Sequence, residues 1–280
     1  MSDWGKGVNN NIGWGQGADN DIGWGSIYDK SNAGETLLSG GGFDTDYQAV
    51  LDFATSEGDT LPSSSQQVIG NALVVQLKNI GVWNKLGSLA MFATDGDDGF
   101  SLIDWKRLAK MTIEGSPVRT INEGWKGNGT DGTINSGYKL QDLTQFDPSN
   151  SLGSFGGWAF DNKASSANSL CGDETDANSI RGGGADDIQG NRCGIKSSDS
   201  GLYHINIDGT NSKQYVNGIF RVTEVIIQNE TSPNNFHALS EGGSNFSTDK
   251  IAILFAGGDL SAEQLDFYNA LETYMDAIAS

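Results

Sequence analysis

The opening segment of the chain carries a tryptophan every ten residues, at Trp4, Trp14 and Trp24, each followed by glycine. An α-helix is excluded, because steps of about 100° per residue turn successive tryptophans away from one face, and glycines destabilise every turn. Ten is an even number, so an extended chain with a side-chain period of two points all three tryptophans the same way. The repeat therefore predicts an extended segment.

The two sides of this segment differ in bulk. From Asp3 to Gly25 the odd positions hold only Gly, Asn or Asp, whereas the even positions carry the large side chains. A glycine face lets another backbone approach closely, and three short repeats cannot enclose a core of their own. We therefore interpret residues 1–42 as an arm that becomes ordered against a partner, in preference to a flexible leader. Its candidate docking residues are Trp4, Gly5, Ile12, Trp14, Gly15, Ile22, Trp24, Gly25 and Tyr28.

The charge of the chain restricts its partners. There are 36 Asp and Glu residues against 17 Lys and Arg, which gives a formal net charge of −19 in 280 residues. This charge opposes binding to nucleic-acid backbones and anionic membranes. The longest apolar run, Ile251 to Ala256, is too short to span a bilayer, and no signal-peptide pattern opens the chain. We expect synthesis in a host cytoplasm, no membrane insertion, and reduced thiols at Cys171 and Cys193.

Two helices are predicted directly after the arm. Apolar residues recur at helical spacing from Asp44 to Gly58, and again from Ser63 to Gly81, where glycine suits a helix end. Residues 43–86 are therefore expected to form a helical lead-in to the remainder of the chain.

Residues 87–280 are expected to form a β-sandwich of the concanavalin A-like (jelly-roll) class with a C-terminal helix. Short apolar runs separated by Gly, Asn and Asp turns are typical of such folds, and Asn217-Gly218 predicts a tight hairpin. The predicted strands are residues 87–93, 118–121, 132–135, 154–160, 168–171, 192–196, 201–207, 213–216, 219–222, 235–239 and 250–255.

The C-terminal helix has the strongest local signals. Ser261 and Gln264 have capping-box spacing, and Leu260 and Leu265 stand at the positions of a hydrophobic staple. One apolar stripe is predicted to pack on the sheet, formed by Leu265, Tyr268, Leu271, Met275 and Ile278.

Catalytic and metal signals are weak. His204 and His237 are the two histidines, neither lies in a nucleophile motif, and the cysteines lack zinc-ligand spacing. Asp95 and Asp97 lie in an acidic, glycine-containing turn that only faintly resembles a calcium loop, so Ca²⁺ is the one cofactor considered. A second acidic cluster at residues 171–176 lacks the further glutamate of a catalytic carboxylate pair. The sequence therefore favours a protein that is not an enzyme.

Five aromatic residues in the sandwich could stack on sugar rings, although most aromatic side chains of such a fold fill its interior. The core is therefore the expected location for each of Trp125, Trp158, Tyr203, Tyr215 and Phe220.

An ordered series of segments resembles tailed-phage fibre and virion structural proteins that contain concanavalin A-like, laminin-G-like sandwiches. The series comprises residues 69–86 (ending Gly-Val-Trp-Asn-Lys-Leu), 101–106 (Ser-Leu-Ile-Asp-Trp-Lys), 124–134, 201–206, 215–218 and 253–278. The Trp-Gly decapeptides of the arm also resemble leaders of phage virion proteins. This resemblance implies a place in the virion, a homotrimer, and contact with host cell-surface glycan, and it supplies no catalytic residues.

The favoured interpretation is a bacteriophage virion structural protein, of tail-fibre or receptor-binding type, whose arm docks on other virion proteins or on copies of itself. Two alternatives stay open. One is a capsid-decorating, head-fibre or connector protein with a purely architectural role, and the other is a glycan depolymerase.

Overall fold

A computed structural model describes residues 42–147, 152–160, 169–173, 179–182, 188–189, 192–195, 200–209, 211–225 and 232–279. The chain divides into two compact units, Met1–Gly42 and Phe43–Ser280. All of the candidate docking residues, from Trp4 to Tyr28, lie outside the described residues, and so does the end of the acidic cluster at residues 174–176.

The two helices predicted after the arm are confirmed. Helix α1 is Thr45–Glu57, the Asp44 side chain accepts a hydrogen bond from the backbone N–H of Asp46, and Gly58 ends the helix with a left-handed φ of 79°. Helix α2 is Ser64–Asn79, and the Ser63 hydroxyl accepts from the N–H of Gln66. Side-chain caps at the first turn and a glycine beyond the last are the local reasons for these bounds.

A large antiparallel sheet forms the middle of the described unit. Its order is β15-β14-β13-β8-β17-β1-β2-β3, and β6 pairs with both β17 and β5. The bounds are β1 Leu86–Met91, β2 Ile103–Asp104, β3 Ala109–Lys110, β5 Val118–Thr120, β6 Gly124–Lys126, β8 Leu152–Ala159, β13 Gly201–Asp208, β14 Asn211–Val216, β15 Ile219–Val225 and β17 Lys250–Gly257.

A second sheet packs against one face of the first. Its order is β11-β12-β10-β9-β16-β7-β4, and its pairings are antiparallel except that β10 and β12 run parallel. The bounds are β4 Thr112–Glu114, β7 Thr133–Asn135, β9 Ser169–Gly172, β10 Ser179–Gly182, β11 Ile188–Gln189, β12 Arg192–Ile195 and β16 His237–Ala238. Short helical turns are α3, Asp98–Ser101, and η2, Leu140–Asp142.

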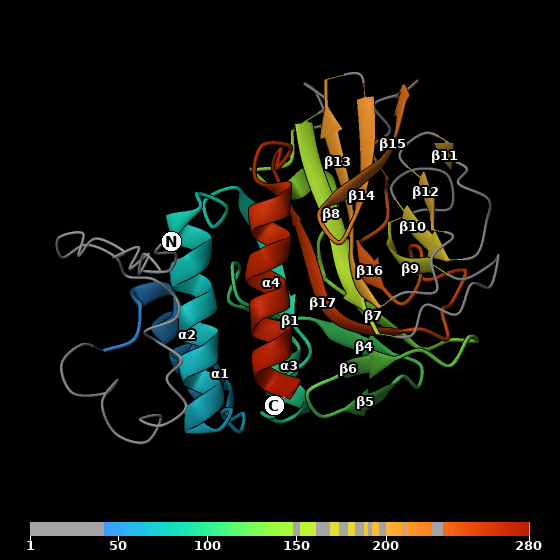
Figure 1. Ribbon diagram of the computed structural model, residues 1–280. Coiled ribbons are helices and arrows are strands. Elements are labelled where there is room, and N and C mark those ends of the chain that lie inside the picture. Colours follow the sequence, from blue (N-terminus) through green and yellow to red (C-terminus); the bar gives the residue numbers. More distant parts are fainter. Residues whose placement is uncertain are drawn as a thin grey trace, which may run out of the picture. The chain divides into compact units, whose positions relative to one another are not determined.

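The described unit has three layers: the helices, the first sheet and the second sheet (Figure 1). Strand β17 lies in the middle layer and is buried on both faces. Ile253 and Phe255 belong to the apolar cluster shared with α1, α2 and α4 (Gln264–Ala279), whereas Leu254 and Ala256 belong to the cluster between the sheets. The predicted mainly-β sandwich with flanking helices is confirmed. Helices α1 and α2 contribute to the apolar cluster on the helix side of the first sheet.

All the predicted strands correspond to strands of the structure, although their ends differ by a few residues and β16 is shorter than predicted. The Asn217-Gly218 hairpin is confirmed, with positive φ angles of 53° and 70° at those two residues and Val216 paired with Ile219. In the described part of the chain, no helix is long and apolar enough to span a membrane.

The prediction for the C-terminal helix was wrong in two respects. Helix α4 begins at Gln264, and the Oε1 atom of that side chain is buried without a hydrogen-bond partner among the described residues, so the capping box does not form. Leu265 is 51% exposed. The buried face consists of Phe267, Ala270, Leu271, Tyr274, Met275 and Ile278. The helix is therefore rotated relative to the predicted stripe, because Phe267 and Tyr274 fill the core more completely than Leu265 and Tyr268.

The two cysteines lie on strands separated by one other strand. Ile180 of β10 pairs with Cys171 on one side and with Cys193 on the other. Two strand spacings amount to about 10 Å, whereas bridged cysteines have Cα atoms within about 7 Å. Cys171 is free and buried, and burial raises the pKa of its thiol far above the ordinary value.

Candidate functional site

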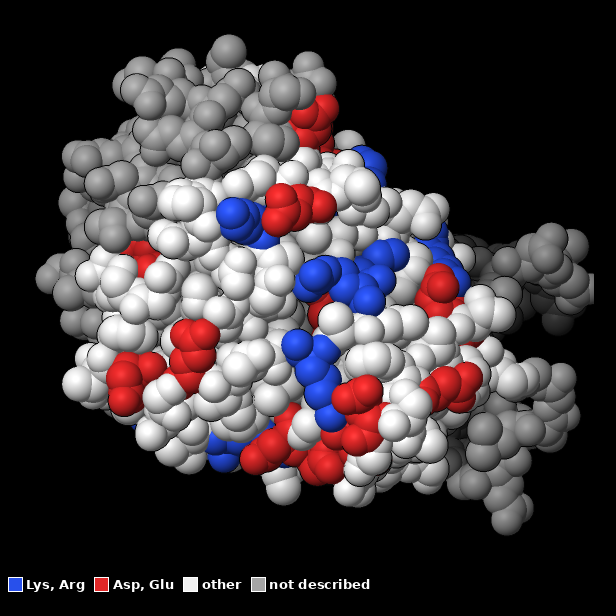
Figure 2. All heavy atoms as spheres, turned by 180° about the vertical axis from the view of Figure 1, so that it is seen from behind, with Lys and Arg blue, Asp and Glu red and all other residues white. Residues whose placement is uncertain are grey.

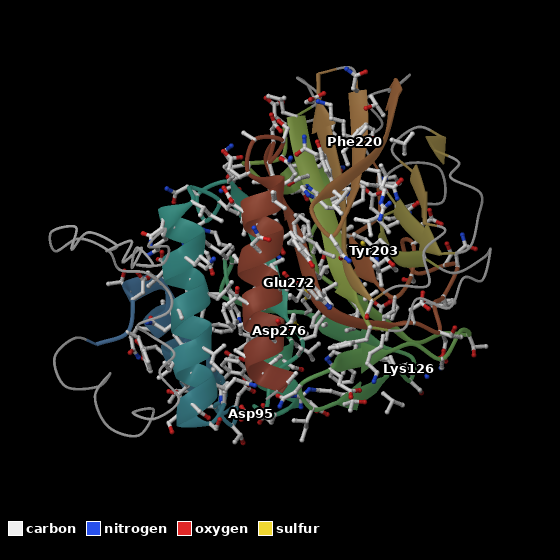
Figure 3. The ribbon with its side chains drawn as sticks, in the orientation of Figure 1. Asp95, Lys126, Tyr203, Phe220, Glu272 and Asp276 are labelled. Atoms are coloured by element: carbon white, nitrogen blue, oxygen red, sulfur yellow. The ribbon has the colours of Figure 1, made fainter. Side chains whose placement is uncertain are left out.

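The structure separates the five candidate stacking aromatics into two groups. Trp125, Trp158, Tyr203 and Tyr215 are buried, with exposed fractions of 8% or less, whereas Phe220 is 51% exposed. Figure 3 shows Phe220 at the outer strands and Tyr203 within the sandwich. The expectation of a core location is confirmed for four residues and is wrong for Phe220, because that residue lies on β15, the edge strand of the first sheet.

Phe220 is the outer end of a row of rings that crosses the helix side of the first sheet. Strand register places Phe220 beside Tyr215 and Tyr215 beside His204, with ring centroids 5.9 Å and 5.5 Å apart. The row continues from His204 to Phe255 at 5.3 Å and from Phe255 to Phe267 of α4 at 4.9 Å. The exposed ring is thus supported by a rigid aromatic row that starts in the core.

Charged groups lie near Tyr215, on the same side of these strands. Lys213 and Tyr215 are two residues apart on β14, so their side chains share a face, and the Lys213 ammonium pairs with the carboxylate of Asp208 on β13. Asp259, in the loop before α4, accepts a hydrogen bond of 2.8 Å from the amide of Asn206. We call Asp208, Lys213, Tyr215, Phe220 and Asp259 the outer-strand surface.

The outer-strand surface has charges of both signs. The hydrogen bond from Lys213 to Asp208 raises the pKa of the lysine, so its ammonium stays charged. Burial opposes ionisation of Asp259, but hydrogen bonds from Ser261 and Asn206 outweigh that effect and lower the pKa of the carboxyl group. Burial raises the pKa of Tyr215, which keeps its phenol neutral. The surface therefore offers two carboxylates, one ammonium and an aromatic face at neutral pH.

The hairpin that carries Phe220 is held by α4. A Cβ atom at Gly218 would lie 2.9 Å from the Leu265 side chain and 3.2 Å from Cβ of Tyr268. Tyr268 in turn stacks on Trp158, with ring centroids 6.0 Å apart and planes 4° from parallel. The positive φ of Gly218 and its missing side chain let the turn lie against the helix, which fixes the position of the exposed ring.

Asp95 and Asp97 serve as backbone caps. The Asp95 carboxylate accepts the N–H of Ser63, and the two oxygens of Asp97 accept the N–H groups of Thr60 and Phe100, at 2.7 and 2.9 Å. Both residues thus fasten the loop before α3 to the start of α2. Within the described ranges, no group of three or more His, Cys, Asp and Glu side chains could hold a metal ion.

Several basic side chains of the described unit pair with acidic ones. Lys110 pairs with Asp59 at 2.7 Å, and Lys250 pairs with Glu123. Figure 2 shows Lys and Arg side chains beside Asp and Glu side chains on the face opposite that of Figure 1.

Sequence reasoning missed two parts of this arrangement. The first is the grouping of Asp208, Lys213 and Asp259, which lie on β13, on β14 and in the loop before α4. These three elements come together only in the folded protein. The network on the outer face of the second sheet, formed by Glu114, Asn135, Asn235 and His237, was also missed. Strand alternation was the available signal for the second, because Ile134 and Ala238 face the core and their neighbours Asn135 and His237 must point outward.

No protein-family model and no curated protein matches this sequence. Among solved structures, Trypanosoma rangeli sialidase is 12% identical, with a TM-score of 0.46 over 74% of this chain and 39% of the sialidase. Domain 4 of a GH43 extracellular arabinanase from Geobacillus stearothermophilus, in complex with arabinotriose, is 15% identical, with a TM-score of 0.48 over 66% of this chain and 98% of that domain. The botulinum neurotoxin serotype D binding domain is 10% identical, with a TM-score of 0.44 over 67% of this chain and 52% of that domain. The chain thus spans well under half the length of the sialidase.

Proposed function

We propose that this chain is a bacteriophage virion structural protein of the receptor-binding type, and that its outer-strand surface binds glycans of the host cell surface. The observation that carries the glycan part is the position of Phe220, the one exposed ring of five candidate aromatics, beside Tyr215. The charges of Lys213, Asp208 and Asp259 in turn act on Tyr215. The virion part rests on the Trp-Gly arm of residues 1–42 and on the ordered series of segments described above.

The chemistry of the outer-strand surface suits a sugar. A pyranose ring has a face of C–H groups that packs on an aromatic ring, and its hydroxyls donate to carboxylates and accept from an ammonium. Because the ring row and the hairpin hold Phe220 in place, little side-chain entropy is lost on binding. These properties favour binding over catalysis.

Replacing Phe220 by alanine should weaken glycan binding about tenfold or more, because a half-buried phenyl ring contributes on the order of 1.4 kcal/mol when its contact is lost. The full chain would be tested on an array of host-surface oligosaccharides, followed by titration calorimetry with the best binder. Val118→Ala is the matched control, since Val118 is 66% exposed and lies on β5. An equal loss in both variants, or none in Phe220→Ala, contradicts the proposed site.

The alternatives have distinct outcomes in the same experiment. Wild-type protein that binds no oligosaccharide on the array supports an architectural role in the capsid or connector. Release of shorter oligosaccharides from host polysaccharide supports a depolymerase.

The double substitution Trp14→Ala and Trp24→Ala should leave the sandwich folded but reduce incorporation into particles. Each tryptophan is expected to contribute about 1.5–3 kcal/mol through the apolar area it buries against a partner. Incorporation would be measured by immunoblot of purified particles, with circular dichroism as the folding check. Asn11→Ala, on the bare side of the arm, is the control. Normal incorporation of the double variant would contradict the proposed docking role of the arm.

A further inference from the structure

A second exposed apolar side chain lies against the hairpin that carries Phe220. Leu265, in the first turn of α4, is 51% exposed, the same fraction as Phe220. A Cβ atom at Gly218 would lie 2.9 Å from a methyl carbon of Leu265, and Phe220 follows Gly218 by two residues. Single exposed apolar side chains are ordinary on protein surfaces. Two of them beside one tight turn form a small patch, which we call the Phe220–Leu265 patch.

Both side chains of this patch lie on the helix side of the first sheet. Phe220 pairs with Tyr215, whose ring belongs to the row that crosses to α4, and Leu265 belongs to the same helix. Ile219, which is 58% exposed, faces the other way. It pairs with Val216, a residue of the apolar cluster between the sheets, and directly paired residues share one face of a sheet. The patch and Ile219 are therefore on opposite sides of one hairpin.

The charged groups of the outer-strand surface already have partners. The Lys213 ammonium pairs with the Asp208 carboxylate. Oδ1 of Asp259 accepts hydrogen bonds from the amide of Asn206 and the backbone N–H of Ser261, each at 2.8 Å. An acidic sugar would have to compete with Asp208 for the one ammonium of this surface, and it would meet the net negative charge of the chain. The surface therefore favours an uncharged ligand.

The Phe220–Leu265 patch has the size of a sugar unit. A stable protein–protein interface takes about 20–30 residues on each side, whereas this patch offers two. Two residues of a strand span about 7 Å, a distance that one pyranose with its substituents covers. An exposed leucine offers no hydrogen bond to a hydroxyl, so the part of a sugar that suits Leu265 is a methyl group. Sugars present a methyl group in two common forms, at C6 of a 6-deoxyhexose and in the acetyl group of an N-acetylhexosamine.

We propose that the outer-strand surface, together with Leu265, selects an uncharged sugar that carries a methyl group. This inference rests on the proposed glycan binding and specifies the class of glycan. The sugar ring lies on Phe220, and its methyl group packs against Leu265, where it is removed from water. In a sugar with a hydroxymethyl group at the same position, the hydroxyl faces a side chain that cannot hydrogen-bond to it. Leu265 therefore discriminates between two sugars that Phe220 alone binds equally well.

The test measures binding of the full chain to two matched pairs of oligosaccharides. One pair ends in L-rhamnose or L-mannose, which differ only in the group at C6, and the other ends in N-acetylglucosamine or glucose. The wild type should bind the methyl-bearing member of one pair about fourfold more tightly, because that is the gain from burying one methyl group. In saturation-transfer NMR of that complex, the methyl protons should receive the strongest signal. The pair that shows the preference identifies the form of the methyl group.

Leu265→Gln should abolish the preference, and Leu265→Met should keep it. Ile219→Gln is the matched control, because Ile219 is similarly exposed but lies on the opposite side of the hairpin, and it should leave the preference unchanged. Circular dichroism checks the fold of each variant.

Three results overturn this inference while glycan binding stands: a preference that survives Leu265→Gln, a preference that Ile219→Gln also abolishes, or equal affinities within both pairs. Failure of the wild type to bind any of the four sugars overturns it as well. The oligosaccharide array of the Phe220→Ala test then shows whether glycan binding itself fails.

Discussion

Replacing His204 by leucine is expected to stabilise the protein and to remove part of its sensitivity to acid. His204 is 2% exposed and its ring lies among those of Tyr215, Phe255 and Phe267. Neither ring nitrogen has a hydrogen-bond partner among the described residues. Leucine has a similar volume and no polar atoms, so at pH 7 the substitution should add about 1–3 kcal/mol to the free energy of unfolding.

The contribution of His204 to the free energy of unfolding falls as the pH is lowered. Burial lowers the pKa of His204 from 6.5 to about 3, although the charge of Asp259 acts in the opposite direction. A lowered pKa means that the unfolded chain binds the proton more tightly than the folded protein. Between pH 6.5 and pH 3 the wild type therefore loses roughly 1.4 kcal/mol per pH unit on account of this residue. Above pH 6.5 the contribution is constant.

Urea unfolding at about pH 7, 5 and 4 measures this effect, and the difference between the two proteins cancels the shared contribution of the carboxyl groups. The stability advantage of His204→Leu should grow as the pH falls. A difference that stays constant with pH, or a leucine variant less stable at pH 7, contradicts the buried neutral histidine.

Replacing Gly156 by alanine is expected to cost at least about 3 kcal/mol of stability. Gly156 of β8 lies between His204 and Phe255 in the strand register. A Cβ atom there would lie 2.1 Å from the backbone oxygen of Tyr203 and 2.8 Å from the Phe255 ring. The missing side chain of Gly156 thus lets the rings of His204 and Phe255 meet. A methyl group at this position would disrupt the row of rings that connects Phe220 and Tyr215 to the core.

Gly209→Ala is the control for this substitution. Gly209 has a φ of +60°, and no other atom lies within 4 Å of the position that a Cβ atom would take there. The substitution therefore costs only the left-handed backbone strain of about 1–2 kcal/mol. Thermal unfolding should show a clearly larger fall in Tm for Gly156→Ala than for Gly209→Ala. Equal falls would mean that the close approach at Gly156 is not decisive for the fold.

The helices and the long strands were predictable because their signals are local. Asp44 and Ser63 provide side-chain caps, and Gly58 takes the left-handed conformation that ends a helix. Strand β17 was visible as an apolar run, since it is buried on both faces. Strands β2, β3, β4, β6, β10 and β11, each of two to four residues, were missed, because segments that short have little periodicity of their own.

The rotation of α4 was not predictable from helical spacing. Phe267 and Leu265 are two positions apart, and both apolar stripes have helical periodicity. Tertiary packing selects between them: Phe267 meets Phe255 and His204, while Leu265 covers the hairpin at Gly218.

The candidate site was predictable only as a set of aromatic residues. Strand alternation alone does not say which of Tyr203, Tyr215 and Phe220 is exposed, because exposure depends on which strand lies at the sheet edge. That information comes from the order β15-β14-β13. The outward pair of Glu114 and His237 likewise required the pairing of β4, β7 and β16.

A crystal structure of the full chain with a bound oligosaccharide tests the central claim most directly. We expect one sugar ring stacked on Phe220, with hydroxyls of the oligosaccharide hydrogen-bonded to Asp208, Lys213 or Asp259. A sugar bound elsewhere on the protein, with the Phe220 ring uncovered, would contradict the account.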